Sequence, residues 1–499
     1  MRSSDRPFRA PRAVGSRLVT AALVLCAAAL PAATIPVTTI DDLDLDDAEC
    51  SLREAIEAAN GDSAYHGCPA GAGADLVVFA FPTPATISLD SELPTITGSL
   101  TLAGPGAERV TIDGGSAVPL LEVDVPAASG LLRVHDLTLS RGFAPASGPV
   151  RGGAITVRGN DSLHLDRVIV RDNQSPRAGG GVLLAPQGGA APTAMIERCL
   201  FVGNAVSFGS VGGGALLAGT GAHLLVDQTT FVGNSSWDPT GGGAVSVLGA
   251  TAVVQRSTFS GNSAVGPGGA IVLASLGDDA SLLITDSTIT GNVADQIPPL
   301  GGPRLGGEAG NGGGIWVAGG VAEGLPNVEL TLGNTLVAGN VDLGPVSHPD
   351  LSLAGAVTAV SLGFNLLGAT EGTAGAWPVG LPNAAGDYVG TVADPVHPGL
   401  GAIGFHGGPT PVHLPIANPA SFTVDHGQCV DAGGDQRGGV DPATGLRPLD
   451  HPTVPNSPDG DRCDIGAVEL GAGPAPGASL FADGFESGTP YLWSASLLD

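Results

Sequence analysis

Residues 254–274, VQRSTFSGNSAVGPGGAIVLA, contain two phrases that recur through the middle of the chain. The first phrase ends in asparagine, and its copies read VRDN, FVGN, FVGN, FSGN, ITGN and VAGN. The second phrase opens with glycines and continues into an apolar segment, as in GGAI from Gly268 and GGGV from Gly179. The closing asparagines recur about every thirty residues, with one longer interval, and such a period is typical of a solenoid or a propeller. They are Asn173, Asn204, Asn234, Asn262, Asn292 and Asn340.

Apolar residues occupy the same positions before each asparagine. The position three residues before it holds Val170, Phe201, Phe231, Phe259, Ile289 and Val337. The positions eight and ten residues before it are also apolar, and this alternation predicts a strand with one buried face. The alternation then changes phase, so we expect a corner followed by a second short strand. The residues expected to stack above one another in a shared interior are Phe201, Phe231, Phe259 and Ile289.

Several short strands per repeat, with no helical pattern between them, predict an all-β fold. We expect a right-handed parallel β-helix with a short N-terminal capping helix and a loop-rich C-terminal closing domain. A β-propeller fits less well, because each blade needs four strands in about 40 residues. Asparagine tolerates left-handed turns, and stacked amides can hydrogen-bond to one another, so the six asparagines should form a ladder along the coils.

The composition agrees with a fold of strands and turns. The 499 residues include 79 Gly and 40 Pro, yet 43% of them are apolar, which favours many short strands over disorder or a helical bundle. The formal net charge is −28, and no lysine is present. We therefore expect no nucleic-acid partner, because phosphate binding needs clustered basic residues.

Residues 1–33 have the pattern of a secretory signal peptide. Five arginines precede the apolar run Leu18–Leu30, and the small residues Ala32 and Ala33 follow it. This run is too short to span a bilayer comfortably. A lipoprotein signal at Cys26 is a weaker alternative, because Leu25 stands where a small residue is usual. Since no later apolar run of about 20 residues occurs, we expect an exported chain without a transmembrane span.

The paired GGAI and FxxN phrases, from Gly152 to Asn340, resemble the repeats of the polymorphic outer membrane protein family. The resemblance implies a pectin-lyase-like β-helix at a bacterial cell surface or outside the cell.

The segment CSLREAIEAAN, residues 50–60, has a clear amphipathic helix pattern in which Ser51 and Glu54 can form a capping box. It resembles the CSLREA domain at the start of secreted bacterial β-helix proteins. We accordingly expect an N-terminal cap over 34–95 and coils over 96–360, because an uncapped solenoid exposes an edge that pairs with other chains. Cys50 and Cys68 have the spacing and compartment expected for a disulfide.

Different phrases occupy residues 361–470, among them GFNLLG, GGPTPVHL, DAGGDQRGG and CDIGAVE. This series resembles the choice-of-anchor Q domain, which closes many such extracellular proteins. Cys429 and Cys463 suit a second disulfide. Ion pairs that lock loops, rather than a catalytic set, are expected of Asp435, Arg437, Arg447 and Asp464. Residues 471–499 are expected to be a linker and a tail, FADGFESG, similar to short tails of secreted proteins from high-GC bacteria.

Asp42, Asp44 and Asp46 form an acidic cluster beside the predicted cap. Carboxylate oxygens in such a cluster would suit calcium, and a solvated acidic segment is the alternative. Asp459, Asp461 and Asp464 raise the same question. No other cofactor is required, and the histidines of the closing domain show no zinc-binding spacing. Those histidines are His397, His406, His413, His426 and His451.

Cys199 is the cysteine left without a partner in the mature chain. Small or medium residues such as Thr229 and Ser257 occupy the same position in other repeats. A buried structural thiol therefore fits the position better than a nucleophile.

Two functions remain. The loops that follow the asparagines leave one corner and would form a wall, of which Val293–Asn311 is the longest part, and such loops often carry recognition. We expect a non-catalytic, adhesion-like protein that binds a glycan or a surface protein. The alternative is a carbohydrate-active enzyme, either a polysaccharide lyase or a glycoside hydrolase, for which facing acids on the outer coils would be the sign.

Overall fold

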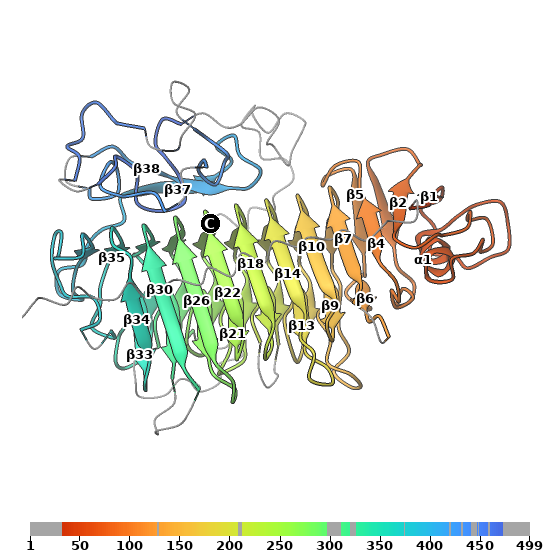
Figure 1. The fold of residues 1–499 in the computed structure, drawn as a ribbon, viewed down its shortest axis with the longest axis horizontal. Helices are drawn as coiled ribbons and strands as arrows, with labels where there is room; N and C mark the ends of the chain where they lie inside the picture. The colour runs from red at the N-terminus through yellow and green to blue at the C-terminus, as the bar shows by residue number, and fades with distance from the viewer. Residues whose placement is uncertain are drawn as a thin grey trace, which may run out of the picture.

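A computed structural model describes residues 32–126, 129–207, 212–296, 311–319, 326–373, 375–418, 421–430, 433–440, 447, 449–457 and 460–472. The predicted signal peptide up to residue 31 and the predicted tail from residue 473 lie outside these residues. Within them the fold is an elongated stack of coils built from four parallel sheets, with a separate segment lying along one side (Figure 1). The predicted parallel β-helix with one short helix is therefore confirmed.

Each complete coil passes through the four sheets in the same order. The first sheet contains β1 (Thr34–Val37), β2 (Asp75–Phe79), β4 (Leu100–Ala103), β7 (Leu131–His135), β10 (Ser162–Asp166), β14 (Thr193–Glu197), β18 (His223–Asp227), β22 (Thr251–Gln255), β26 (Ala280–Thr285), β30 (Val328–Gly333) and β34 (Thr358–Ser361). The second contains β3 (Ala85–Ser88), β5 (Val110–Asp113), β8 (Thr138–Ser140), β11 (Ile169–Arg171), β15 (Leu200–Val202), β19 (Thr230–Val232), β23 (Thr258–Ser260), β27 (Thr288–Thr290), β31 (Leu336–Val337), β35 (Leu366–Leu367) and β36 (Tyr388–Val389).

The other two sheets complete the coil. The third contains the two-residue strands β12 (Gln174–Ser175), β16 (Ala205–Val206), β20 (Ser235–Ser236), β24 (Ser263–Ala264), β28 (Val293–Ala294) and β32 (Val341–Asp342). The fourth contains β6 (Leu121–Val123), β9 (Ile155–Arg158), β13 (Val182–Ala185), β17 (Leu216–Ala218), β21 (Val245–Leu248), β25 (Ile271–Ala274), β29 (Ile315–Ala318) and β33 (Leu351–Ala354).

The change of phase in the sequence corresponds to the corner between the first and second sheets. One residue there has a positive φ in each coil, for example Arg198 at 53° and Arg256 at 46°. A single left-handed residue reverses which side of the chain faces inward, so both strands bury their apolar positions.

The glycine phrase lies where the third-sheet corner meets the fourth sheet. A Cβ atom on Gly243 would collide with the carbonyl oxygen of Gly269 in the next coil, and Gly214 stands in the same relation to Gly243. The backbones of neighbouring coils approach so closely at this corner that only glycine fits.

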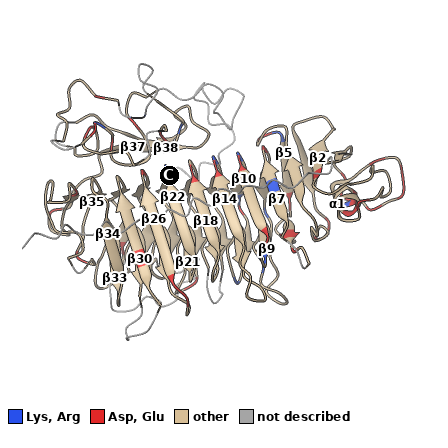
Figure 2. Cartoon of the chain, viewed as in Figure 1, with Lys and Arg blue, Asp and Glu red and all other residues tan. Residues whose placement is uncertain are grey.

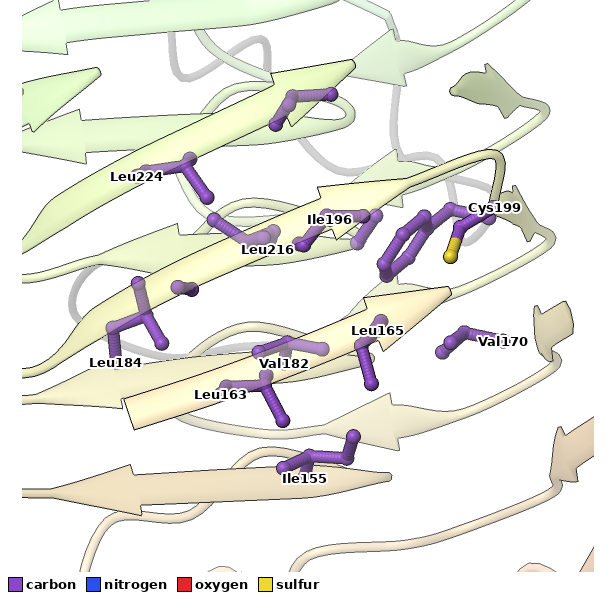
Figure 3. Packing of buried hydrophobic residues seen from close by; sticks show 14 of the residues in the cluster. Ile155, Leu163, Leu165, Val170, Val182, Leu184, Ile196, Cys199, Leu216 and Leu224 are labelled. Carbon is purple, nitrogen blue, oxygen red and sulfur yellow. The ribbon is translucent and has the colours of Figure 1, made fainter. Parts of the chain in front are cut away.

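The interior is filled by inward-facing apolar side chains from the first, second and fourth sheets. Leu163, Leu165, Val170, Val182 and Ile196 point into the same space from three sheets (Figure 3). These five side chains are almost fully buried. The burial of such a continuous core across successive coils is the main stabilising contribution expected of a solenoid.

The N-terminal helix α1 (Leu52–Asn60) begins with the predicted capping box between Ser51 and Glu54. Parallel pairing starts ahead of it, because β1 pairs with β2 and β2 pairs with β4. It also continues to β36, which pairs with β35. The expected coil limits of 96 and 360 were therefore too narrow at both ends. The cap and the start of the expected closing domain supply strands to the same ladders.

The remaining described residues, from 390 to 472, are here called the closing segment. Its two strands, β37 (Leu400–Gly404) and β38 (Val412–Pro415), pair antiparallel. The segment turns back and lies along the outside of the later coils, above the ends of the first-sheet strands in Figure 1.

Candidate functional site

The loops that follow the asparagines leave the coils at one corner, beside the third sheet. Neighbouring third-sheet strands pair in register, as Ala205 pairs with Ser235 and Ser235 with Ser263. The loops are also tied to neighbouring coils, because the Ser236 hydroxyl donates to the carbonyl oxygen of Gly212 at 3.2 Å. The third-sheet strands and the described parts of these loops therefore form a continuous surface, which we call the loop wall. Most of its longest loop, residues 297–310, lies outside the described residues.

Asp342 organises the end of the loop wall. Its carboxylate accepts hydrogen bonds from the backbone N–H groups of Asn311, Gly344 and His348, each at 2.9 Å. The Asn311 side chain in turn donates to Asp295 at 2.7 Å. These contacts fix the C-terminal edge of the wall on the rigid coils. Trp237, in the loop after β20, offers a partly exposed aromatic ring near its middle.

A second surface follows the corner between the first and second sheets. Acidic residues occupy consecutive coils in register, since Asp166 pairs with Glu197 and Glu197 pairs with Asp227. Charged residues of both signs gather at the ends of β10 and β14 (Figure 2). Arg167 and Arg198 each contact Asp166 at 2.7 Å.

Neighbouring histidine and arginine side chains lower the pKa of two acids at this corner, Glu197 and Asp136. His164 lies 2.9 Å from Glu197, and this hydrogen bond lowers the pKa of Glu197 although burial opposes the shift. Burial would likewise raise the pKa of Asp136, but hydrogen bonds from His135 and Arg167 outweigh it and bring the pKa to about 2. A general acid in glycoside hydrolysis needs a raised pKa. Asp136 and Glu197 are therefore ionised near neutral pH and suited to pairing with cations.

Sequence reasoning missed the arginines that lie beside this acidic column. The signal was present in the next position of the repeat, which holds Arg167, Arg198 and Arg256, although Gln228 and Asp286 occupy it in other coils. Arg256 pairs with Asp227 through an Nη2–Oδ2 distance of 2.5 Å.

The six asparagines lie above one another at the corner between the second and third sheets. The side-chain amide of each of the first five donates to the amide oxygen of the next asparagine at 2.8–2.9 Å. Each also donates to a backbone carbonyl of the preceding coil, as Asn234 does to Phe201 at 3.0 Å. The last one, Asn340, donates to the carboxylate of Asp350 at 2.9 Å. Burial raises the pKa of Asp350 to about 7, although the hydrogen bonds it accepts oppose the shift.

Phe201, Phe231 and Phe259 stack in the interior. The ring centroids of Phe201 and Phe231 are 4.8 Å apart, and those of Phe231 and Phe259 are 4.7 Å apart with nearly parallel planes. Ile289 follows Phe259 in the ladder register. Each of three successive coils contributes one ring, and together the rings give continuous aromatic packing in the middle of the core.

Cys199 is fully buried and forms no disulfide. Burial raises the pKa of its thiol to about 12, and the thiol donates to the carbonyl oxygen of Glu197 at 3.1 Å. In the next coil the Thr229 hydroxyl donates to the carbonyl of Asp227 in the same way, at 2.9 Å. A thiol held protonated and out of solvent is not suited to nucleophilic attack.

Both predicted disulfides are present, between Cys50 and Cys68 and between Cys429 and Cys463.

The three acids proposed for calcium do not converge. Asp42 is fully engaged, because Arg53 donates to both of its oxygens at 3.1 and 2.8 Å and the N–H of Asp90 donates at 2.9 Å. An arginine beside a carboxylate supplies the positive charge that a cation would otherwise provide. Among the described residues, Asp44 instead lies with Glu54 and His66.

The second acidic cluster also separates. Asp459 lies outside the described residues, Asp461 accepts the N–H of Cys463 at 3.1 Å, and Asp464 is buried with its oxygens bonded to the N–H groups of Asp425 and Leu470.

Arg447 anchors the closing segment on the coils. It is fully buried, and its guanidinium lies 2.7 Å from Asp286 and 3.5 Å from Glu469. Arg437 pairs with Asp435 at 2.8 Å within the closing segment. Burial raises the pKa of Glu469 to about 7, although Arg447 opposes the shift, and burial with the neighbouring Glu469 raises that of Asp464.

The closing segment also covers hydroxyl groups on the outer face of the second sheet. Gln436 accepts from the Thr258 hydroxyl at 2.6 Å and donates to Thr230 at 2.7 Å. His413 lies 2.9 Å from the Ser260 hydroxyl and 2.7 Å from the Gly401 carbonyl oxygen. Among the described residues none of the five closing-domain histidines belongs to a group suited to a metal. This part of the second sheet is therefore an internal interface.

Residues 256–273 match the Chlamydia polymorphic membrane protein repeat. The matched segment runs from the corner before β23, through the ladder residue Asn262, into β25, and so covers both recurring phrases. The coils thus define a parallel β-helix with repeats similar to those of that family. No curated protein matches the chain, and no solved structure matches it. In the described part of the chain, no helix has both the length and the apolar character needed to cross a membrane.

Proposed function

We propose that this chain is a non-catalytic, exported protein, extracellular or attached to the outer cell surface of a bacterium, that binds a glycan or a surface protein through the loop wall. The observation that carries the proposal is the in-register third sheet, whose strands bring the starts of loops of different sequence side by side on a rigid support. Recognition commonly uses loops presented in this way.

The location is supported by independent features. The repeat match is to a membrane protein family of Chlamydia, and two disulfides suit an oxidising compartment. The signal-like residues 1–33 and the resemblance to CSLREA and choice-of-anchor Q domains fit the same location.

A glycan array probed with the mature, disulfide-bonded chain tests the binding function, with intact bacterial and host cells as a second target. Trp237→Ala in the loop wall should weaken binding by about tenfold or more, because aromatic residues on a binding surface commonly dominate such contacts. Met195→Ala on the first sheet is the matched control and should bind normally. Absence of binding to both glycans and cells would overturn the proposal.

A carbohydrate-active enzyme is the second candidate, and the column of Asp166, Glu197 and Asp227 is the observation that favours it. The same preparations should be assayed for reducing ends and unsaturated products. Product release that is lost in Glu197→Gln would replace the binding proposal with the enzymatic one.

A further inference from the structure

Three side chains with metal-binding atoms converge beside the N-terminal helix. The Nδ1 atom of His66 lies 3.1 Å from an oxygen of Asp44 and 3.3 Å from an oxygen of Glu54. The ligand atoms of all three residues lie within 4.8 Å of one another. They come from three separate places in the chain: the acidic segment before the helix, the first turn of α1, and the loop after it.

We propose that Asp44, Glu54 and His66 bind a divalent transition-metal ion, with Zn²⁺ as the preferred ion. One imidazole nitrogen faces two carboxylate oxygens, and a single N–H can make a linear hydrogen bond to only one of them. A metal ion between the three ligands satisfies all of them at once. In tetrahedral zinc sites, bonds of about 2.0–2.2 Å place neighbouring ligand atoms about 3.4 Å apart. The two separations from the Nδ1 atom of His66, 3.1 and 3.3 Å, need to open by only a few tenths of an ångström.

The nitrogen ligand decides the type of metal. Calcium prefers six to eight oxygen ligands, whereas imidazole together with carboxylates suits zinc. Three protein ligands would leave a fourth position for water. Asp44 is 48% exposed, so the site is open to solvent on its side.

The surrounding contacts hold the ligands in place before any metal binds. The Glu54 side chain is only 3% exposed, and its two oxygens accept the N–H groups of Leu45 at 2.8 Å and Ser51 at 2.9 Å. The ring of Tyr65 packs on that of His66 with centroids 4.1 Å apart. Partners that orient ligands in this way strengthen metal binding.

The disulfide links the segments that carry two of the ligands. Cys50 precedes the helix cap, and Cys68 closes the turn that contains His66, since Tyr65 and Cys68 exchange backbone hydrogen bonds at 3.2 and 2.9 Å. This covalent link reduces the ordering required when a metal binds. The metal would then fasten the acidic segment to α1.

The test is metal binding by the mature, disulfide-bonded chain after removal of bound metal with a chelator. Isothermal titration with Zn²⁺ should show one site per chain, and Co²⁺ should give the absorption bands of tetrahedral coordination. Ca²⁺ should bind more weakly than Zn²⁺. His66→Ala and Asp44→Asn should each weaken Zn²⁺ binding by about 100-fold, because each removes a direct ligand.

Asp46→Asn is the matched control, since Asp46 lies in the same segment outside the triad, and it should bind Zn²⁺ as the unchanged chain does. Circular dichroism and the mass of the oxidised chain establish that the variants retain the helix and disulfide. Three results would overturn the proposal: no Zn²⁺ bound by the unchanged chain, equal binding by His66→Ala, or preference for Ca²⁺.

Discussion

The coil interior and the interface under the closing segment are both buried, but they contain different chemistry. The coils from β10 to β31 bury aliphatic side chains, a phenylalanine stack and neutral amides that hydrogen-bond to their own copies. The closing segment instead buries Arg447 against Asp286 and Glu469, with Asp464 nearby. A repeat can satisfy a polar group with the same group one coil away. A segment without repeats needs specific partners far away in the sequence, and here these partners are charged.

The comparison predicts that the stability of the coil interior depends most on the phenylalanine stack. Phe231→Ala should lower the free energy of unfolding by about 4 kcal/mol, because it leaves a cavity between two stacked rings. Urea unfolding measures the change. Leu225→Ala, on the partly exposed outer face of β18, is the control and should cost about 1 kcal/mol. Equal losses for the two variants would show that the stack is not central to stability.

The closing interface should respond differently to a single change. Arg447→Met should lower the stability of this interface by about 3 kcal/mol, because the buried carboxylates of Asp286 and Glu469 would lose the guanidinium of Arg447. Limited proteolysis should then cut the closing segment while the coils stay intact. Arg462→Met, an exposed arginine, should change stability by less than about 0.5 kcal/mol. Coils that unfold together with the segment would contradict the distinction between the two regions.

A substitution in the asparagine ladder tests whether the neutral amides contribute less to stability than the phenylalanine stack. Asn234→Ala should cost about 2 kcal/mol, because the backbone and side-chain N–H groups of Asn204 lose their shared acceptor. Chemical unfolding measures this loss. Thr251→Ala on the exposed face of β22 should have almost no effect. A cost above that of Phe231→Ala would reverse the expected order.

The smallest effect concerns pH, where both regions contain a carboxyl group with a raised pKa. The pKa values of Asp350 and Glu469 are raised to about 7 by burial, whereas unfolded carboxyls titrate near pH 4. The folded chain therefore binds more protons than the unfolded chain between about pH 4 and 7. These two groups consequently make the stability fall as pH rises through that window.

Thermal unfolding from pH 4 to 8 measures this slope. Asp350→Asn should reduce the slope, while the contribution of Glu469 should remain. An unchanged slope in that variant would show that Asp350 does not titrate in this range.

The repeats could be predicted from the sequence because their information is local and recurs. Phe201, Phe231 and Phe259 stand at the same distance from an asparagine, so one coil predicts its neighbours. The ends of the coil region were harder to predict, because β35 and β36 lack the recurring phrase and yet pair within the second sheet. The candidate loop wall could be located from the sequence, but its contacts at Asp342 could not.

Sequence alone determined that this chain forms stacked coils, because inward apolar positions, glycine corners and ladder asparagines repeat in fixed order. Only the tertiary structure decided where the closing segment lies and which basic side chains contact which acids. Arg53 lies beside Asp42, Arg447 reaches Asp286, and His66 joins Asp44 and Glu54. These contacts join separate segments of the chain, and the local periodicity of the repeats carries no information about which segments meet.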